Sequence, residues 1–227
     1  MEFCAFAEAQ TSGRSGSVFL KDVSRGLKLG ESSTALISAL DALRKHTIAS
    51  VPRVVNLTRQ VRPVILLTDA AADETSVSLG GCIFDEATGR REFFGCRLQG
   101  PILDEWRAEG KEQLICQAEL IAVPIAIWTW RRYLLQRNVL AFVDNEPAKD
   151  ALIRGTSSSQ ASSIMVQQTR IMCASFGTGP WFARVPSPSN IADGPSRKEN
   201  RELFKLGAKH IVPALPSCFP NASLVAF

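Results

Sequence analysis

The sequence lacks the features that identify a zinc-binding or a membrane-spanning protein. Its six cysteines form no Cys-x-x-Cys pair and its only two histidines, His46 and His210, lie far apart, so a zinc site is not expected. The longest apolar stretch, residues 114–128, is interrupted by a glutamine, a glutamate and a proline, which excludes a membrane span. The chain does not open with a charged-then-apolar leader. We therefore expect an intracellular, reducing compartment, without a more precise address.

Charge is distributed unevenly along the 227 residues. The excess of basic side chains lies in residues 1–60 and 198–227, whereas residues 61–197 carry 14 basic against 15 acidic side chains. Basic flanks around such a core suit a domain that gathers carboxylates for metal ions and lies near a polyanion. A random distribution of surface charge explains the pattern about equally well, so charge alone leaves both interpretations open.

Hydrophobic patterning divides the chain into an N-terminal connector (1–60), a core (61–197) and a C-terminal tail (198–227). The connector contains one amphipathic helical pattern, at residues 34–45, and the proline-containing tail is expected to pack loosely. The core has the order β-β-β-α-β-α-α-β-α, which predicts an α/β fold with a five-stranded mixed sheet and helices packed on it. The predicted elements are strands 64–69, 76–86, 91–98, 139–144 and 181–185, and helices 111–136, 146–154, 160–174 and 191–196.

Turn and cap residues support these boundaries. Gly89 can supply the positive φ of a hairpin turn between the second and third strands. Asn145 is suited to cap the helix 146–154, and Gly155 is suited to end it.

Four carboxylates stand where acids could meet a metal ion. Asp69 and Asp144 end the first and fourth predicted strands, and adjacent parallel strands bring their C-terminal ends to one rim. Glu119 lies in an apolar run without a nearby cation, where an unpaired buried carboxylate costs several kcal/mol. Asp193 opens the last predicted helix. Each acid alone is explained by a strand end, a polar helix face or a helix cap, but the four together favour a metal site.

Such a cluster would select hard cations. Close carboxylates repel one another unless cations neutralise them. Oxygen ligands favour Mg²⁺, with Mn²⁺ as the second possibility, over zinc. Two such ions about 3.5–4 Å apart can activate a water and stabilise the departing oxygen in phosphodiester cleavage.

Short motifs surround these acids in a fixed order. They are Thr68-Asp69-Ala70, Gly80-Gly81, Ala118-Glu119-Leu120, Val143-Asp144-Asn145 and Asn190-Ile191-Ala192-Asp193, followed by Ser196-Arg197. In this order they resemble the signatures of type 1 ribonucleases H, in particular the ribonuclease H domains attached to retroelement reverse transcriptases. The C-terminal signature of those domains is similar to Arg184-Val185-Pro186-Ser187 followed by residues 190–193 and 196–197. The resemblance covers more than half of the chain and implies a ribonuclease H-like fold.

The resemblance also implies an activity, a cofactor and partners. The activity is hydrolysis of the RNA strand of an RNA–DNA hybrid, with two Mg²⁺ ions. Asp69, Glu119, Asp144 and Asp193 are then both the catalytic and the metal-binding residues. The expected nucleic-acid contacts are Gly80, Gly81, Asn145, Thr156, Ser157 and Asn190, although a β-bulge and a polar loop explain several of them as well. A reverse transcriptase polymerase domain, in cis or in trans, is a further expected partner; this chain has no Asp-Asp pair and should not itself polymerise.

Two departures from the family pattern leave alternatives open. Residues 187–189 lack the histidine that many members carry before the last aspartate. Pro124 falls inside the helix predicted at 111–136, where it removes a hydrogen bond at a cost of about 3 kcal/mol, so we expect a kink or break that could misaim Glu119. The alternative is a catalytically decayed or domesticated domain that acts as a nucleic-acid-binding scaffold. A third possibility is another nuclease or a transposase-like enzyme on the same fold.

Overall fold

The computed structural model describes residues 62–73, 76–109 and 114–227, without the side chain of residue 109. The chain divides into two units, Met1–Arg59 and Gln60–Phe227, and everything described below belongs to the second. The helical pattern at 34–45 lies outside the described residues. Among the helices that are described, none has the length and apolar character needed to cross a membrane.

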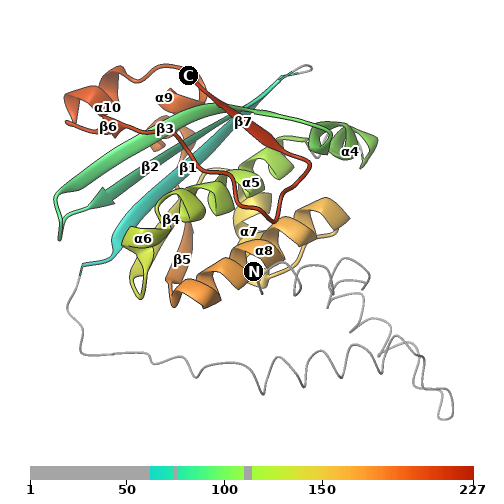
Figure 1. The fold of residues 1–227 in the computed structure, drawn as a ribbon, viewed down its shortest axis with the longest axis horizontal. Coiled ribbons are helices and arrows are strands. Elements are labelled where there is room, and N and C mark those ends of the chain that lie inside the picture. Colours follow the sequence, from blue (N-terminus) through green and yellow to red (C-terminus); the bar gives the residue numbers. More distant parts are fainter. Residues whose placement is uncertain (1–61, 74–75, 110–113) are drawn as a thin grey trace, which may run out of the picture. The chain divides into compact units, whose positions relative to one another are not determined.

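Within the described residues, a seven-stranded mixed sheet forms the centre of the domain (Figure 1). The antiparallel strands β1, β2 and β3 are followed by β4 and β5, which run parallel to β1, in the spatial order β5-β4-β1-β2-β3. Their bounds are Val64–Ala72, Val77–Asp85, Arg90–Gln99, Asn138–Val143 and Gly179–Arg184. The predicted α/β class, with helices packed on a mixed sheet, is confirmed, although the sheet of the described residues has seven strands and not the five predicted.

Helices cover both faces of this sheet. On one face α5 (Leu114–Thr129), α7 (Glu146–Arg154) and α8 (Gln160–Phe176) enclose the larger core, and on the other α9 (Asp193–Ser196) and α10 (Arg201–Lys205) help to enclose a smaller one. Alternate strand residues serve the two faces, so that Leu66 and its neighbour Leu67 lie in different cores. The remaining short elements are α4 (Ile102–Glu109), α6 (Arg131–Leu134) and the 3₁₀ turn η2 (Ser187–Ser189).

The local signals at turns and caps are confirmed. Gly89 has a φ of 69° in the β2–β3 hairpin. The side chain of Asn145 accepts a hydrogen bond from the Ala148 N–H at 2.9 Å, which caps α7. Gly155 ends α7 in the left-handed region with a φ of 81°.

Of the kink or break expected at Pro124, the break is wrong, and the kink stays a prediction. The predicted helix 111–136 appears as α5 and α6, and α5 continues through Pro124 without interruption. All residues of α5 from Gln117 to Ile127 are buried. Burial of so much apolar surface against the sheet and α8 offsets the hydrogen bond that proline removes. The helix α4 has no counterpart in the predicted order.

The C-terminal segment is part of the sheet, so the expectation of loose packing is wrong. β6 (Lys209–His210) pairs in parallel with β3, and β7 (Ser223–Ala226) pairs antiparallel with the same strand. Leu203 and Phe219 are 1% and 4% exposed. The C-terminal elements α10, β6 and β7 contain two to five residues each, too few to show a helical or strand periodicity in the sequence.

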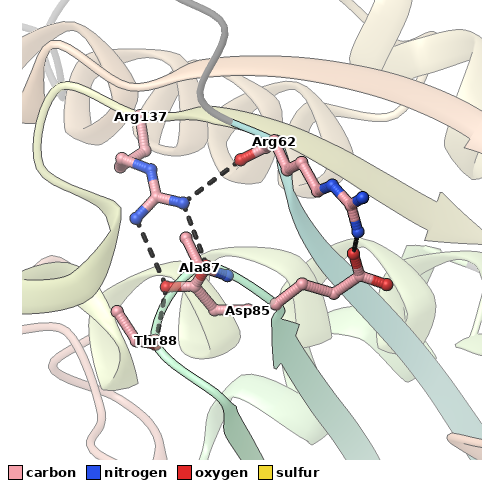
Figure 2. A network of polar contacts seen from close by, with 6 residues as sticks. Arg62, Asp85, Ala87, Thr88 and Arg137 are labelled. Carbon is pink, nitrogen blue, oxygen red and sulfur yellow. Dashed lines mark hydrogen bonds and ion pairs between the residues drawn. The ribbon is translucent and has the colours of Figure 1, made fainter.

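An ion pair between the buried Asp85 and the half-buried Arg137 fixes the β2–β3 hairpin to the start of β4 (Figure 2). The side chain of Asp85 is 2% exposed and accepts hydrogen bonds from Arg137 Nη2 at 3.0 Å and Thr88 Oγ1 at 2.8 Å. Arg137 Nη2 also donates to the Arg62 carbonyl at 3.2 Å. Burial raises the pKa of Asp85, but the hydrogen bonds from Arg137 and Thr88 outweigh it and hold this pKa below its usual range.

Arg137→Ala should therefore lower the free energy of unfolding by about 2–3 kcal/mol, because it leaves the Asp85 carboxylate buried without its cation. Urea denaturation at pH 7 measures the loss. Lys205→Ala, which breaks a solvent-exposed pair with Glu202, is the control and should leave the midpoint close to that of the wild type. Equal losses in both variants would contradict a special role for the Asp85–Arg137 pair.

Candidate metal centre

Asp69 lies inside β1, three residues before its end, and pairs with Gly80 of β2. The sequence prediction that Asp69 ends the strand is wrong, because the alanines that follow continue the strand despite their weak apolar signal. On the other side of β1, the parallel pairing with β4 ends at Leu67 and Phe142. Asp144 follows β4 directly. It therefore lies beside the last residues of β1, which have no pairing partner on β4.

The helix α5 packs on β1 and brings Glu119 to the same place. Glu119 Oε1 accepts a hydrogen bond from the Ala70 N–H at 3.2 Å. The side chain belongs to a residue that is 2% exposed, and its Oε2 has no hydrogen-bond partner among the described residues. One carboxylate oxygen in the protein interior is thus left without a donor, which is costly for the ionised carboxylate unless a cation binds it.

Asp69, Glu119 and Asp144 form a compact group of oxygen ligands. One carboxylate oxygen from each residue lies within 4.8 Å of the others. Asp69 and Glu119 are buried, whereas Asp144 is half-buried, so the group borders on solvent at Asp144. Three carboxylates at this spacing fit a hard divalent cation, and the unpartnered Glu119 oxygen supports that fit.

The protonation of the group reflects its burial. Burial raises the pKa of Glu119 to about 10, with further increases from the charges of Asp69 and Asp144. The pKa of Asp69 is raised to about 7: burial is the main cause, a hydrogen bond from Ser196 opposes it, and Asp144 and Asp193 raise it further. Without a cation, the group therefore holds protons at neutral pH.

Two residues of the segment 190–196 hold Asp69. Asn190 Nδ2 donates to Asp69 Oδ1 at 3.2 Å, and Ser196 Oγ donates to Asp69 Oδ2 at 2.6 Å. Asn190 is 4% exposed, so its expected role as a nucleic-acid contact is corrected: its amide serves the carboxylate cluster. The sequence interpretation gave Ser196 no role. Its position three residues after Asp193, one helical turn along α9, is the signal that could have identified it.

Asp193 is not a member of the compact group. It begins α9 as predicted, but its Oδ1 lies 2.6 Å from Arg197 Nε, and its side chain is 41% exposed. It still raises the pKa of Asp69, so it stands within electrostatic reach of the group. The structure thus brings together three of the four predicted ligands and places the fourth at their border.

Gly80 and Gly81 do not offer an open surface to nucleic acid. A Cβ atom at Gly80 would lie 2.3 Å from the carbonyl oxygen of Ala192, and one at Gly81 would lie 2.5 Å from the ring of Phe94. Both glycines are buried. The close approach that requires them is made by the chain itself, which corrects the expectation of a hybrid backbone at these positions.

The other expected nucleic-acid contacts lie at or near the N-termini of α7 and α8. Asn145 caps α7 next to Asp144. In the loop before α8, the Ser157 N–H donates to Ser163 Oγ at 3.1 Å, and the Thr156 hydroxyl is buried without a hydrogen-bond partner in the described part of the chain. Contacts of Asn145, Thr156 and Ser157 with nucleic acid remain predictions.

No family model matches the sequence, and no protein of curated function matches it either. Solved structures that it resembles include RNase H1 of the halophilic archaeon Halobacterium salinarum NRC-1, at 15% identity and a TM-score of 0.44, over 61% of this chain and 98% of that one. LC11-RNase H1, isolated from compost by a metagenomic approach, has 15% identity and a TM-score of 0.46, over 63% and 98%. The N-terminal RNase H domain of a Mycobacterium tuberculosis protein has 10% identity and a TM-score of 0.46, over 64% of this chain and 98% of that one. These likenesses concern the fold alone.

Proposed function

We propose that this domain is a metal-dependent endonuclease that hydrolyses the RNA strand of RNA–DNA hybrids. The observation that carries the proposal is the buried Glu119 carboxylate, which has one oxygen without a donor and lies within 4.8 Å of ligand oxygens from Asp69 and Asp144. When its carboxylates are ionised, such a group is unfavourable in a protein that binds no cation. The ordered motifs that resemble type 1 ribonucleases H support the choice of substrate.

Asp69, Glu119 and Asp144 would hold a first Mg²⁺ ion, and Asp193, at the border of the group, would contribute to a second. When bound, such ions supply a metal-activated water and stabilise charge on the departing oxygen. The exposed guanidinium of Arg197 beside Asp193 adds positive charge at the edge of the site, where it would attract the phosphodiester backbone.

We further propose an intracellular role beside a reverse transcriptase polymerase domain, in cis or in trans, in a retroelement. The support for this context is the similarity of residues 184–197 to the C-terminal signature of ribonuclease H domains in such elements. Addition of the full chain to a polymerase-only reverse transcriptase should permit removal of the RNA template during cDNA synthesis. Persistence of the intact template would contradict this role.

The alternative function, a nucleic-acid-binding scaffold, is favoured by one observation: the turn Ser187–Ser189 contains no histidine that could assist turnover. Pro124, the other feature that favoured the scaffold in the sequence, does not break α5, and Glu119 lies in the carboxylate cluster.

Cleavage of defined duplexes separates the two functions. The full chain is incubated with an end-labelled RNA–DNA hybrid in Mg²⁺, in Mn²⁺ or in EDTA, with RNA–RNA and DNA–DNA duplexes of the same sequence alongside. We expect cleavage of the RNA strand of the hybrid alone, only with a divalent ion. Hybrid binding without cleavage in either ion would replace the enzyme by the scaffold, and cleavage of a DNA strand would indicate a different nuclease.

A further inference from the structure

Both carboxylate oxygens of Asp69 are held by buried donors from the segment 190–196. Ser196 is 2% exposed and donates to Oδ2 at 2.6 Å, whereas Asn190 donates to Oδ1 at 3.2 Å. The Asn190 amide is itself fixed, because it also donates to the Thr68 carbonyl at 3.0 Å and accepts from the Ala192 N–H at 3.2 Å. Asp69 therefore has one orientation that satisfies both donors.

A row of glycines lets this segment lie directly on the sheet. Asp69 pairs with Gly80, and Gly80 pairs in turn with Gly95 on β3. A Cβ atom at Gly80 would lie 2.7 Å from the backbone nitrogen of Ser196, and one at Gly95 would lie 2.5 Å from the carbonyl oxygen of Pro195. The backbone of α9 can approach the sheet this closely only because side chains are absent there, and this approach brings Ser196 within reach of Asp69.

We infer that Ser196 and Asn190 are positioning residues that set the metal affinity of the carboxylate cluster by fixing Asp69; the inference rests on the proposed metal site. A carboxylate oxygen has two lone pairs, so each oxygen of Asp69 accepts one hydrogen bond and keeps a second lone pair for a metal ion. Loss of a group that orients a metal ligand typically costs 10-fold to 100-fold in metal affinity. The same segment contains Asp193, so one stretch of chain both orients Asp69 and places Asp193.

The test is a titration of the full chain with Mn²⁺, in which the electron paramagnetic resonance signal of free Mn²⁺ measures how much of the ion is bound. Ser196→Ala should weaken Mn²⁺ binding by about 10-fold or more. Ser163→Ala is the matched control, because Ser163 is also a buried serine, and its hydroxyl donates to the Ser157 carbonyl at 2.8 Å. Both variants should lose similar thermal stability in EDTA, but Ser163→Ala should bind Mn²⁺ as the wild type does.

Asn190→Ala, which removes the donor to the other oxygen, is the second variant and should also weaken Mn²⁺ binding. At saturating Mn²⁺, Ser196→Ala should cleave hybrid with an unchanged KM, because the defect lies in the metal site. Affinities within twofold of the wild type in both folded variants, or an equal loss in Ser163→Ala, would overturn the inference. Failure of the wild type to bind Mn²⁺ would instead overturn the proposed metal site.

Discussion

Asp69→Asn should lower the rate of hybrid cleavage by roughly 1000-fold or more while leaving hybrid binding intact. A metal ion contributes several kcal/mol to the stabilisation of a phosphoryl transition state, and each 1.4 kcal/mol corresponds to about a factor of ten in rate. Asp69 is a buried member of the cluster, held on both oxygens, and an amide is a much poorer ligand for Mg²⁺ than a carboxylate. Single-turnover cleavage and a filter-binding assay on the same hybrid measure the two quantities.

Asp150→Asn is the matched control for this variant. It also removes one negative charge, but from the surface of α7, where Asp150 pairs with Lys149. Its cleavage rate should stay within about twofold of the wild-type rate, because exposed ion pairs contribute little. Residual activity of Asp69→Asn above a tenth of the wild-type rate would contradict a metal site built on Asp69.

The sequence was sufficient to predict the fold because the first three strands are long and each pairs with the strand that follows it in the chain. β1, β2 and β3 follow one another through tight connections, and the buried run that begins at Val64 marks the central strand. The place of Glu119 followed from the cost of an unpaired carboxylate in an apolar helix. These features are local or follow from burial, so single-sequence patterns contain them.

The partners of Asp69 could not be predicted in the same way. Ser196 lies 127 residues from Asp69 in the chain, and its contact exists because Gly80 and Gly95 admit α9 against the sheet. The spacing from Asp193 places Ser196 one helical turn along α9, but no periodicity encodes the contact of α9 with the sheet. The effect of Pro124 was overestimated for a related reason, since a local rule measures the lost hydrogen bond but not the burial of the whole helix.

Replacement of the ionisable Glu119 carboxyl by an amide should stabilise the metal-free protein at alkaline pH. Its carboxyl has a pKa of about 10 in the folded chain against an ordinary value of 4.5, so the folded protein holds this proton more tightly than the unfolded chain. Stability from this group is complete below pH 4.5 and is lost progressively as the pH rises toward 10; Asp69 adds a similar loss between 3.8 and about 7. At pH 8 in EDTA, Glu119→Gln should therefore exceed the wild type by on the order of 2 kcal/mol.

Thermal and urea denaturation between pH 5 and 9 measure this effect. Glu86→Gln, which replaces an exposed acid of the β2–β3 hairpin, is the control and should leave the dependence of stability on pH unchanged. Addition of millimolar Mg²⁺ should reverse the order at pH 8, because the ion binds the folded wild type and stabilises it by mass action, whereas the amide variant binds it poorly. A wild type that is more stable than Glu119→Gln in EDTA at pH 8 would mean that the Glu119 carboxylate is stabilised by the chain alone. The cation would then not be needed to explain its burial, and the observation on which the proposed function depends would lose its force.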